Sequence, residues 1–314
     1  MNTFRTGIGR MTLALPVLLI VFLSLAASNF LAAQNLTNVT GQITALLIVT
    51  LGQMLVALVA GIDLSVGSVM SLAGCLIATQ ADPFAGDALP RNHTGTVLAL
   101  LMGLCVGLVN GLGIAIAGIH PLIMTLATMT FLQGLAYLVL PIPGGQVAPA
   151  LGQLVNGTAA GVPLPLLWCA ACMLAVYVLL HRSRLGLHIF AVGAQARSAH
   201  LNGVQSRTVV VAAYVLCSLL AVVAGIYLTA RVSAGDPTMG AAFGLESVAA
   251  VALGGVQLTG GVGSILGVVI GALSLGLITN GINLFGISPF LRGAVTGLLL
   301  LLAVCSQRRK VVGL

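Results

Sequence analysis

The residues of this sequence that could do chemistry are few, and most stand at breaks between long apolar stretches. The segment Gly61-Ile-Asp-Leu-Ser-Val-Gly67 places Asp63 and Ser65 directly before a new apolar run. Either side chain can accept hydrogen bonds from the free amides at the start of a helix. A carboxylate among membrane segments is costly and tends to line an aqueous path. This motif could therefore cap the following helix or line an aqueous path, and the same residues could do both.

The same polar pattern recurs later in the chain. Asp236 and Thr238 have the spacing of Asp63 and Ser65, and both roles are open for them as well. Four amides lie in or beside apolar runs, where they could hydrogen-bond a hydroxylated solute, although bonds between helices explain them equally well. These amides are Asn110, Asn280, Asn283 and Gln257.

Several signatures of enzymes are absent from the sequence. The only lysine, Lys310, follows Arg309, so no G-x-x-x-x-G-K-[ST] loop exists to hold ATP and its magnesium ion. No H-E-x-x-H or G-x-S-x-G motif occurs. The six cysteines are scattered without the spacing of a metal site or a disulfide framework. We therefore expect no catalytic residue, no metal and no cofactor on this chain.

Composition identifies the solvent of the chain as lipid. Of 314 residues, 59% are hydrophobic and 5% are charged, and the mean hydropathy is +1.16. Soluble domains carry about 25% charged residues, so this chain lacks the polar surface that water requires. The net charge of +7 comes from cations at segment ends. A nucleic-acid-binding protein would present a basic face with stacking aromatics instead, so we expect membrane lipid as a partner and no nucleic acid.

Apolar windows between turn signals predict an all-α integral membrane protein of about ten spans. A span needs about 20 apolar residues to cross about 30 Å of hydrocarbon. We interpret the first apolar run as a retained span, because it exceeds the 7–15 residues of a signal-peptide core. Residues 1–314 then form a single transmembrane domain. The predicted spans cover residues 13–33, 42–60, 65–79, 96–117, 121–140, 164–180, 209–230, 243–256, 262–280 and 289–305.

The positions of the cations predict the orientation of the spans, because Lys and Arg are retained on the cytoplasmic side. A ten-span arrangement puts nine cations on one side and three on the other, which predicts cytoplasmic N- and C-termini. The three external cations are Arg91, Arg231 and Arg292. The nine internal ones are Arg5, Arg10, Arg182, Arg184, Arg197, Arg207, Arg308, Arg309 and Lys310.

An internal repeat is visible in the loops. The Asp63 motif recurs at Asp236, Asn110-Gly111 recurs as Asn280-Gly281, and Gly118-Ile-His-Pro121 recurs as Gly286-Ile-Ser-Pro289, all at nearly equal offsets. Each offset equals five predicted spans, and an odd number of crossings inverts the second copy. We therefore expect two inverted five-span repeats, over about residues 34–163 and 208–306, as in transporters that alternate access about a midplane.

The most polar stretch, residues 182–207, is predicted to be cytoplasmic. Residues 185–204 within it are expected to form a short amphipathic helix. Its small residues could dock in the groove of a partner protein. A helix lying on lipid headgroups, with Arg197 and Arg207 toward phosphates, is the alternative.

The sequence resembles the permease subunits of ribose-type carbohydrate ABC importers, a family related to branched-chain amino-acid permeases. The similarity follows five motifs in order over nearly the whole chain: Gly61-Ile-Asp-Leu-Ser-Val-Gly-Ser68, Ala191-Val-Gly-Ala194, Leu201-Asn-Gly-Val204, Ala252-Leu-Gly-Gly255 and Asn280-Gly-Ile-Asn-Leu-Phe-Gly-Ile-Ser-Pro289.

The resemblance implies a bacterial inner-membrane assembly. A second permease subunit would complete the path, a separate ATP-binding subunit would use ATP and magnesium, and a periplasmic solute-binding protein would deliver the cargo. The resemblance also implies that the 185–204 segment is the coupling helix that contacts the ATPase. Its residues would include Gly193, Ala194, Gln195, Arg197, Ala199, Asn202 and Gly203.

Other hypotheses remain open at this level. An ion-coupled secondary carrier also fits inverted repeats, and it would work without any ATPase subunit. A membrane-embedded enzyme would need a nucleophile and a base converging in one cavity. The solute itself is undetermined: ribose, xylose, arabinose, another sugar or polyol, and the autoinducer-2 signal all fit.

Overall fold

The computed structural model describes residues 7–80, 92–288 and 290–306. Within these ranges the chain is almost entirely helical, with a single two-stranded hairpin, β1 (Thr158–Ala159) and β2 (Val162–Pro163). The helices are α1 (Gly7–Ala26), α2 (Ala33–Leu58), α3 (Val66–Thr79), α4 (His93–Ala115), α5 (Pro121–Val139), α6 (Pro149–Asn156), α7 (Leu164–Arg182), α8 (Arg184–Leu201), α9 (Ser206–Val232), α10 (Phe243–Leu253), α11 (Ile265–Leu284) and α12 (Phe290–Ser306).

A helix lies at each of the ten predicted spans. Six helices are long and apolar enough to cross a membrane: α2, α4, α5, α7, α9 and α11. The apolar stretches of α1, α3, α10 and α12 are shorter. At 1.5 Å per residue, the 14 residues of α3 and the 11 of α10 rise about 20 Å or less and do not span the hydrocarbon alone. The integral-membrane class is therefore supported, and the count of ten crossings stays a prediction. Arg5, Arg91 and the cations from Arg308 onward lie outside the described residues.

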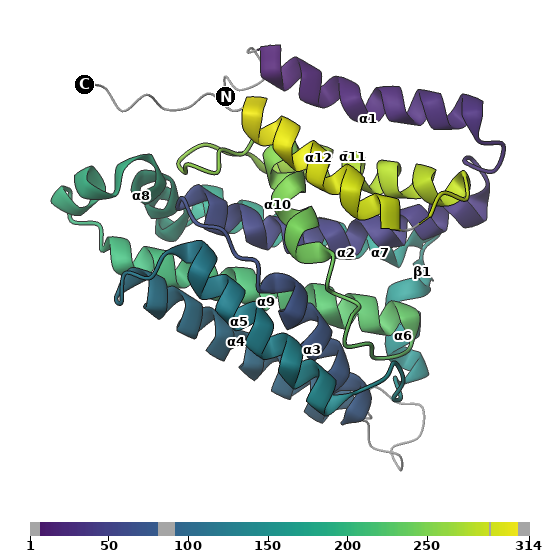
Figure 1. Ribbon diagram of the computed structural model, residues 1–314, viewed down its shortest axis with the longest axis horizontal. Helices are drawn as coiled ribbons and strands as arrows, with labels where there is room; N and C mark the ends of the chain where they lie inside the picture. The colour runs from purple at the N-terminus through teal and green to yellow at the C-terminus, as the bar shows by residue number, and fades with distance from the viewer. Residues whose placement is uncertain (1–6, 81–91, 289, 307–314) are drawn as a thin grey trace.

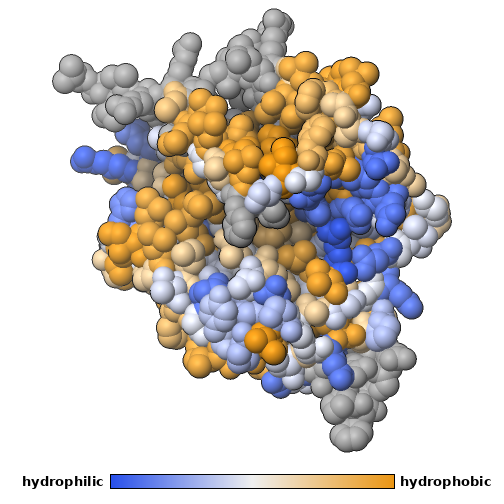
Figure 2. Space-filling view, turned by 45° about the vertical axis from the view of Figure 1, so that its right-hand side comes forward, coloured by the Kyte–Doolittle hydropathy of each residue, from blue (hydrophilic) through white to orange (hydrophobic). Residues whose placement is uncertain are grey.

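Helix α2 lies at the centre of the bundle. In its most apolar window 89% of the residues are buried, against 22% in α5 and in α7. The outer helices turn large apolar side chains outward, as at Phe131 (66% exposed) and Leu138 (79%). Figure 2 shows apolar side chains over much of one face, with hydrophilic residues gathered in patches. A surface of this kind is suited to lipid.

Two long helices end in the same unusual way. After α2, Ala60 has φ +62°, and after α9, Ser233 has φ +60°. The left-handed conformation costs a residue with a Cβ about 1–2 kcal/mol, so the surrounding structure must hold both turns. Each turn lies three residues before an aspartate, Asp63 or Asp236, and leads into a short helix, α3 or α10.

The packing of α2 to α5 resembles that of α9 to α12. Helix α3 packs on α4, α5 and α9, and α10 packs on α11, α12 and α2. Helix α4 packs on α9, α11 packs on α2, and α2 packs on α9. The helices correspond in order: α2 to α9, α3 to α10, α4 to α11 and α5 to α12. When each helix is replaced by its counterpart, the same set of contacts is obtained.

Helix α3 meets the loop that leads into α10 through two glycines, and we call this contact the α3–α10 crossing. A Cβ added to Gly67 would collide with the carbonyl oxygen of Gly240, and a Cβ added to Gly240 would collide with that of Gly67. Next to this contact, the Gly240 amide donates to the Ser71 hydroxyl at 2.9 Å. Only residues without side chains allow this approach of two backbones, so the crossing depends on both glycines.

The bundle has two different ends (Figure 1). Helix α8 lies at the same end as the start of α1 and the end of α12, whereas α6 and the hairpin lie at the opposite end. The sequence did not indicate α6 or the hairpin, because these elements are too short to give a periodic pattern.

Candidate functional site

The break between α2 and α3 holds a buried polar network. Oδ1 of Asp63 accepts hydrogen bonds from the Ser65 amide (2.9 Å) and the Ser65 hydroxyl (2.6 Å). Nδ2 of Asn110 on α4 donates to the Ser65 hydroxyl at 3.0 Å, and the Thr128 hydroxyl on α5 donates to Oδ1 of Asn110 at 2.6 Å. Asp63, Ser65 and Asn110 are fully buried. The network joins α3, α4 and α5 across the break.

The backbone of the same break is also bonded by side chains. With its amide oriented to suit its neighbours, Gln53 donates to the Asp63 carbonyl at 2.9 Å and accepts from the Asp63 amide at 3.1 Å. Oδ2 of Asp63 is buried and has no hydrogen-bond partner among the described residues. Asp63 therefore bonds locally at the entrance to α3, and it is not among the residues that line the cavity described below.

Asp236 makes the same local bonds in a different setting. Its Oδ1 accepts from the Thr238 amide and the Thr238 hydroxyl, each at 2.7 Å. Unlike Asp63, Asp236 is only half-buried, and Thr238 is exposed. Gln133 of α5 donates to the Pro237 carbonyl at 2.7 Å and so ties this loop to the first half of the chain.

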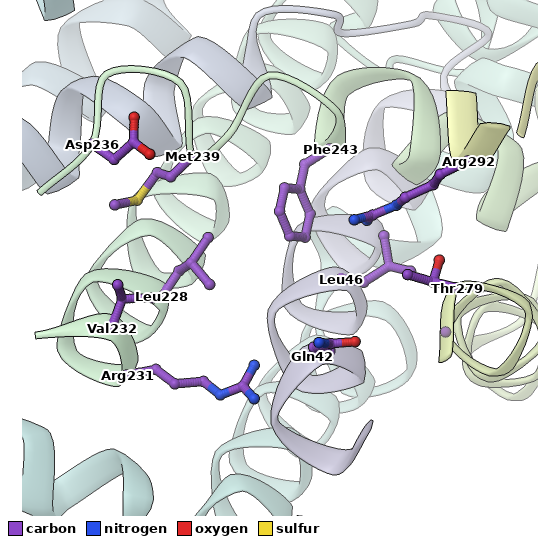
Figure 3. Close-up of a pocket in the computed structure, with 11 residues that line it drawn as sticks. Gln42, Leu46, Leu228, Arg231, Val232, Asp236, Met239, Phe243, Thr279 and Arg292 are labelled. Carbon is purple, nitrogen blue, oxygen red and sulfur yellow. The ribbon is translucent and has the colours of Figure 1, made fainter. Parts of the chain in front are cut away.

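Asp236 lines a cavity of about 480 Å³ between α2, α9, α10, α11 and α12 (Figure 3). Polar groups reach it from several elements, and between them lie apolar side chains. Such a mixture of apolar walls with a few convergent polar groups is typical of small-molecule sites. The lining residues are Gln42, Leu46, Leu228, Arg231, Val232, Asp236, Met239, Phe243, Gly276, Thr279 and Arg292.

Two arginines, Arg231 and Arg292, carry the positive charge in the lining of the cavity. Nη2 of Arg231 donates to the carbonyl oxygen of Asn38 at 3.1 Å. Nη2 of Arg292 pairs with Oε2 of Glu246 at 2.6 Å, and Glu246 is 5% exposed. Figure 3 shows both guanidinium groups directed toward the space between the helices.

The four predicted amides, Gln257 included, are not among the residues that line the cavity. Asn110 belongs to the buried network, and Asn280 pairs with Asn35 of α2 through two amide bonds of 2.8 and 3.3 Å. Asn283 is exposed near the end of α11. For Asn110 and Asn280, the structure agrees with bonds between helices, which was one of the two roles left open. Of the residues singled out for a solute path, only Asp236 lies on this cavity.

Sequence reasoning missed Gln42, Arg231, Thr279 and Arg292 as site residues. Both arginines were interpreted as orientation signals because they stand at the ends of spans. A usable signal existed, since a cation inside an apolar protein is costly and tends to face a cavity. No group of three or more metal-ligating side chains occurs within the described residues.

Helix α8 is bent and contacts both halves of the chain. Gln195 interrupts it with φ −162° and ψ 100°, and residues 194–197 are exposed. Gly203 follows with φ +83°. The predicted helix is therefore present, but its interruption is at Gln195 and it ends before Asn202.

On its inner face, α8 contacts the end of α2 and the loop between α10 and α11 through closely packed backbones. We call this contact the glycine junction; it consists of Gly193, Leu58, Gly260 and Gly261. A Cβ on Gly193 would collide with the Leu58 carbonyl, and the Gly261 amide donates to that same carbonyl at 2.9 Å. Because Leu58 ends α2 and Gly261 belongs to the loop between α10 and α11, movement of α8 must displace one or both.

Long apolar helices, two of them followed by similar breaks and one of these breaks lying on a polar cavity, are consistent with an integral membrane permease. A family model described as the branched-chain amino acid transport system / permease component matches residues 35–304. The chain belongs to this family.

Curated relatives of the chain cover nearly its whole length. It is 36% identical to the ribose import permease protein RbsC of Escherichia coli K12, over 94% of this chain and 92% of that one. It is 35% identical to the probable ABC transporter permease protein y4mJ of Sinorhizobium fredii (93% and 86%) and 31% identical to the D-allose transport system permease protein AlsC of Escherichia coli K12 (94% and 89%). No solved structure matches significantly.

Proposed function

We propose that this chain is the membrane permease subunit of an ATP-binding-cassette importer for a monosaccharide. The supporting observation is that the named ribose and allose permeases match it over nearly the whole length of both chains. The described chain adds a polar cavity among apolar helices, as a path for a hydroxylated solute requires.

The two halves form inverted repeats in this proposal. Three observations support it. Asp63 and Asp236 accept the same two hydrogen bonds, and a left-handed turn precedes each of them. The helix contacts of one half also correspond to those of the other. Repeats of this kind allow the same chain to open toward either side of the membrane.

The assembly is placed in the bacterial inner membrane with α8 and both termini in the cytoplasm. In support, α8 and the terminal helix ends share one end of the bundle, and the cations of residues 182–207 gather there. A periplasmic solute-binding protein would then contact the end that holds α6 and the hairpin. A second permease subunit and an ATP-binding subunit complete the proposal, because this chain has no phosphate-binding loop.

Helix α8 is proposed as the segment that contacts the ATPase. Its exposed bend at Gln195 faces away from the bundle, while Gly193 rests on the glycine junction. A push on α8 would therefore reach α2 and the α10–α11 loop together. ATP can shift the conformational equilibrium only if the ATPase binds one arrangement of α8 more tightly than the other.

Reconstitution tests the proposed class. The chain is placed in proteoliposomes with a candidate ATPase subunit and a candidate solute-binding protein from the same genome, and uptake of labelled D-ribose and D-allose is measured. We expect uptake that requires ATP inside the vesicles and the binding protein outside. Uptake by the chain alone, abolished by an ionophore that dissipates the ion gradient, would instead identify a secondary carrier.

Arg197 tests the coupling assignment. Its exposed cation on the bent part of α8 is available to a carboxylate on a partner, so Arg197→Glu replaces attraction with repulsion. We expect uptake to fall at least about tenfold, which corresponds to about 1.4 kcal/mol, while the ATPase subunit keeps its own hydrolysis. Arg207→Glu, another exposed cation at the same end, is the matched control. Equal uptake by both variants and the unchanged protein argues against α8 as the coupling segment.

A further inference from the structure

We propose that the cavity lined by Gln42, Arg231, Thr279 and Arg292 is a solute subsite that holds one neutral, polyhydroxylated molecule during transit. This inference rests on the proposed function and adds where within the chain the solute binds. We call the cavity the arginine subsite. Its residues come from five helices and the loop before α10, so a molecule bound there would contact both halves of the chain.

The guanidinium of Arg231 lies where Gly41 on α2 leaves space, because glycine has no side chain. A Cβ on Gly41 would lie 2.6 Å from Nε and 2.7 Å from Cζ of Arg231, so the guanidinium occupies the space that any larger residue would fill. The Asn38 carbonyl, one helical turn away, accepts from Nη2. A guanidinium has five N–H donors in a fixed plane. Gly41 and Asn38 thus fix its orientation while leaving donors for a ligand.

Arg292 supplies a second donor in the same wall. Its Nη2 is taken by Glu246, but its Nε is buried without a hydrogen-bond partner among the described residues. Because Nε is enclosed by protein, it is not itself available to a solute. The Arg292 side chain as a whole is 35% exposed, so its remaining N–H groups can donate to a hydroxyl group of a bound solute.

The charges around the subsite favour a neutral ligand. Arg292 is paired with Glu246, and the cation of Arg231 shares the cavity with the carboxylate of Asp236. The two positive and two negative groups balance, so an anion such as a sugar phosphate would gain little net attraction. Neutral hydroxyls can instead accept from the arginines and donate to Asp236 or to the Gln42 carbonyl. The apolar members of the lining offer surface to the carbon face of a sugar ring.

The subsite is connected to the helix crossing. The lining segment from Asp236 to Phe243 includes Gly240, which packs directly on Gly67 of α3. A change in the crossing would therefore move one wall of the subsite relative to Gln42 and Arg231. The affinity of the subsite is then coupled to the conformation, as release of a transported solute requires.

The first experiment compares variants in the reconstituted complex. Gly41→Ala keeps every charge and improves helix propensity, but its methyl group displaces the Arg231 guanidinium. Arg231→Gln removes the cation and keeps a donor. We expect each to raise the sugar concentration for half-maximal uptake about tenfold, as loss of a charge-assisted hydrogen bond implies. The matched control is Gly134→Ala on α5, where a Cβ meets no described atom within 4 Å.

The second experiment detects occupancy directly. Thr279→Cys places a thiol in the wall of the subsite, and its alkylation by N-ethylmaleimide is followed by mass spectrometry in the intact complex. We expect the transported sugar, with D-ribose and D-allose as probes, to slow alkylation of this thiol but not of a thiol introduced by Gln205→Cys at an exposed position between α8 and α9. D-ribose 5-phosphate should not protect.

The possible failures are distinguishable. If no sugar is taken up by the unchanged complex, the proposed function fails and the subsite fails with it. If a sugar is taken up but leaves the introduced thiol of Thr279→Cys unprotected, and Gly41→Ala behaves like Gly134→Ala, the importer stands and the subsite is overturned. Protection by the phosphate alone would also overturn it, because the charge argument excludes an anion.

Discussion

Asp63 and Asp236 make the same pair of hydrogen bonds, but Asp63 is fully buried whereas Asp236 is half-buried and lines the arginine subsite. The bonds of Asp63 are fully buried, so loss of its carboxylate leaves the amide and the hydroxyl of Ser65 without their acceptor. Around Asp236, water can replace the lost carboxylate. Identical chemistry at the two aspartates therefore contributes differently to stability and to transport.

This difference gives a matched prediction. We expect Asp63→Ala to lower the free energy of unfolding by about 2 kcal/mol or more, and Asp236→Ala to lower it by less than about 1 kcal/mol. Asp236→Ala should weaken uptake instead, since its side chain lines the cavity. Thermal melting in detergent and uptake in proteoliposomes measure the two effects. Equal melting temperatures for both variants would contradict the burial argument.

At the scale of the elements, the α3–α10 crossing is a contact between the backbones of α3 and of the loop before α10. A methyl group at Gly67 meets the rigid carbonyl oxygen of Gly240 rather than a flexible side chain, so α3 and this loop must separate to admit it. Separation also breaks the bond from Gly240 to Ser71. The crossing therefore tolerates neither glycine being replaced.

We expect Gly67→Ala to lower the yield of folded protein severalfold, with a destabilisation of about 1–3 kcal/mol from overpacking. Gly297→Ala on α12 is the control, because a Cβ there meets no described atom within 4 Å. Size-exclusion chromatography of a fluorescent fusion measures the yield. Similar yields for the two variants would mean that the crossing can relax without cost.

The elements were more predictable from the sequence than the site was. Long apolar windows indicate helices directly, and the motifs at Asp63 and Asp236 predicted two similar breaks, which the structure shows as similar turns. The partners of Asn110 and Asn280 depended on tertiary packing, so the sequence could not choose between a solute and another helix. Arg231 and Arg292 were assigned to orientation because they stand at the ends of predicted spans. The cost of a cation among apolar helices pointed to a cavity, but which residues form its walls, such as Gly41 beside Arg231, depends on tertiary packing.

At the scale of the whole molecule, the two breaks differ in a way that bears on the proposed inverted repeats. The break at Asp63 is sealed by a buried network, while the break at Asp236 borders the arginine subsite. If the repeats exchange conformations during transport, the sealed break must open when the other one closes. The present arrangement then corresponds to access from the end that holds α6 and the hairpin.

Cysteines at equivalent positions test this exchange. Ser65 is fully buried at rest and Thr238 is exposed, so we expect N-ethylmaleimide to modify Thr238→Cys but not Ser65→Cys in the resting complex. During ATP turnover with the solute-binding protein and sugar present, residue 65 should become reactive and residue 238 should become at least about tenfold slower, because a population shift of this size needs only about 1.4 kcal/mol. Omission of ATP is the control. If residue 65 stays unreactive throughout turnover, the two halves do not exchange conformations, and the solute must cross the chain by a route that leaves the Asp63 network intact.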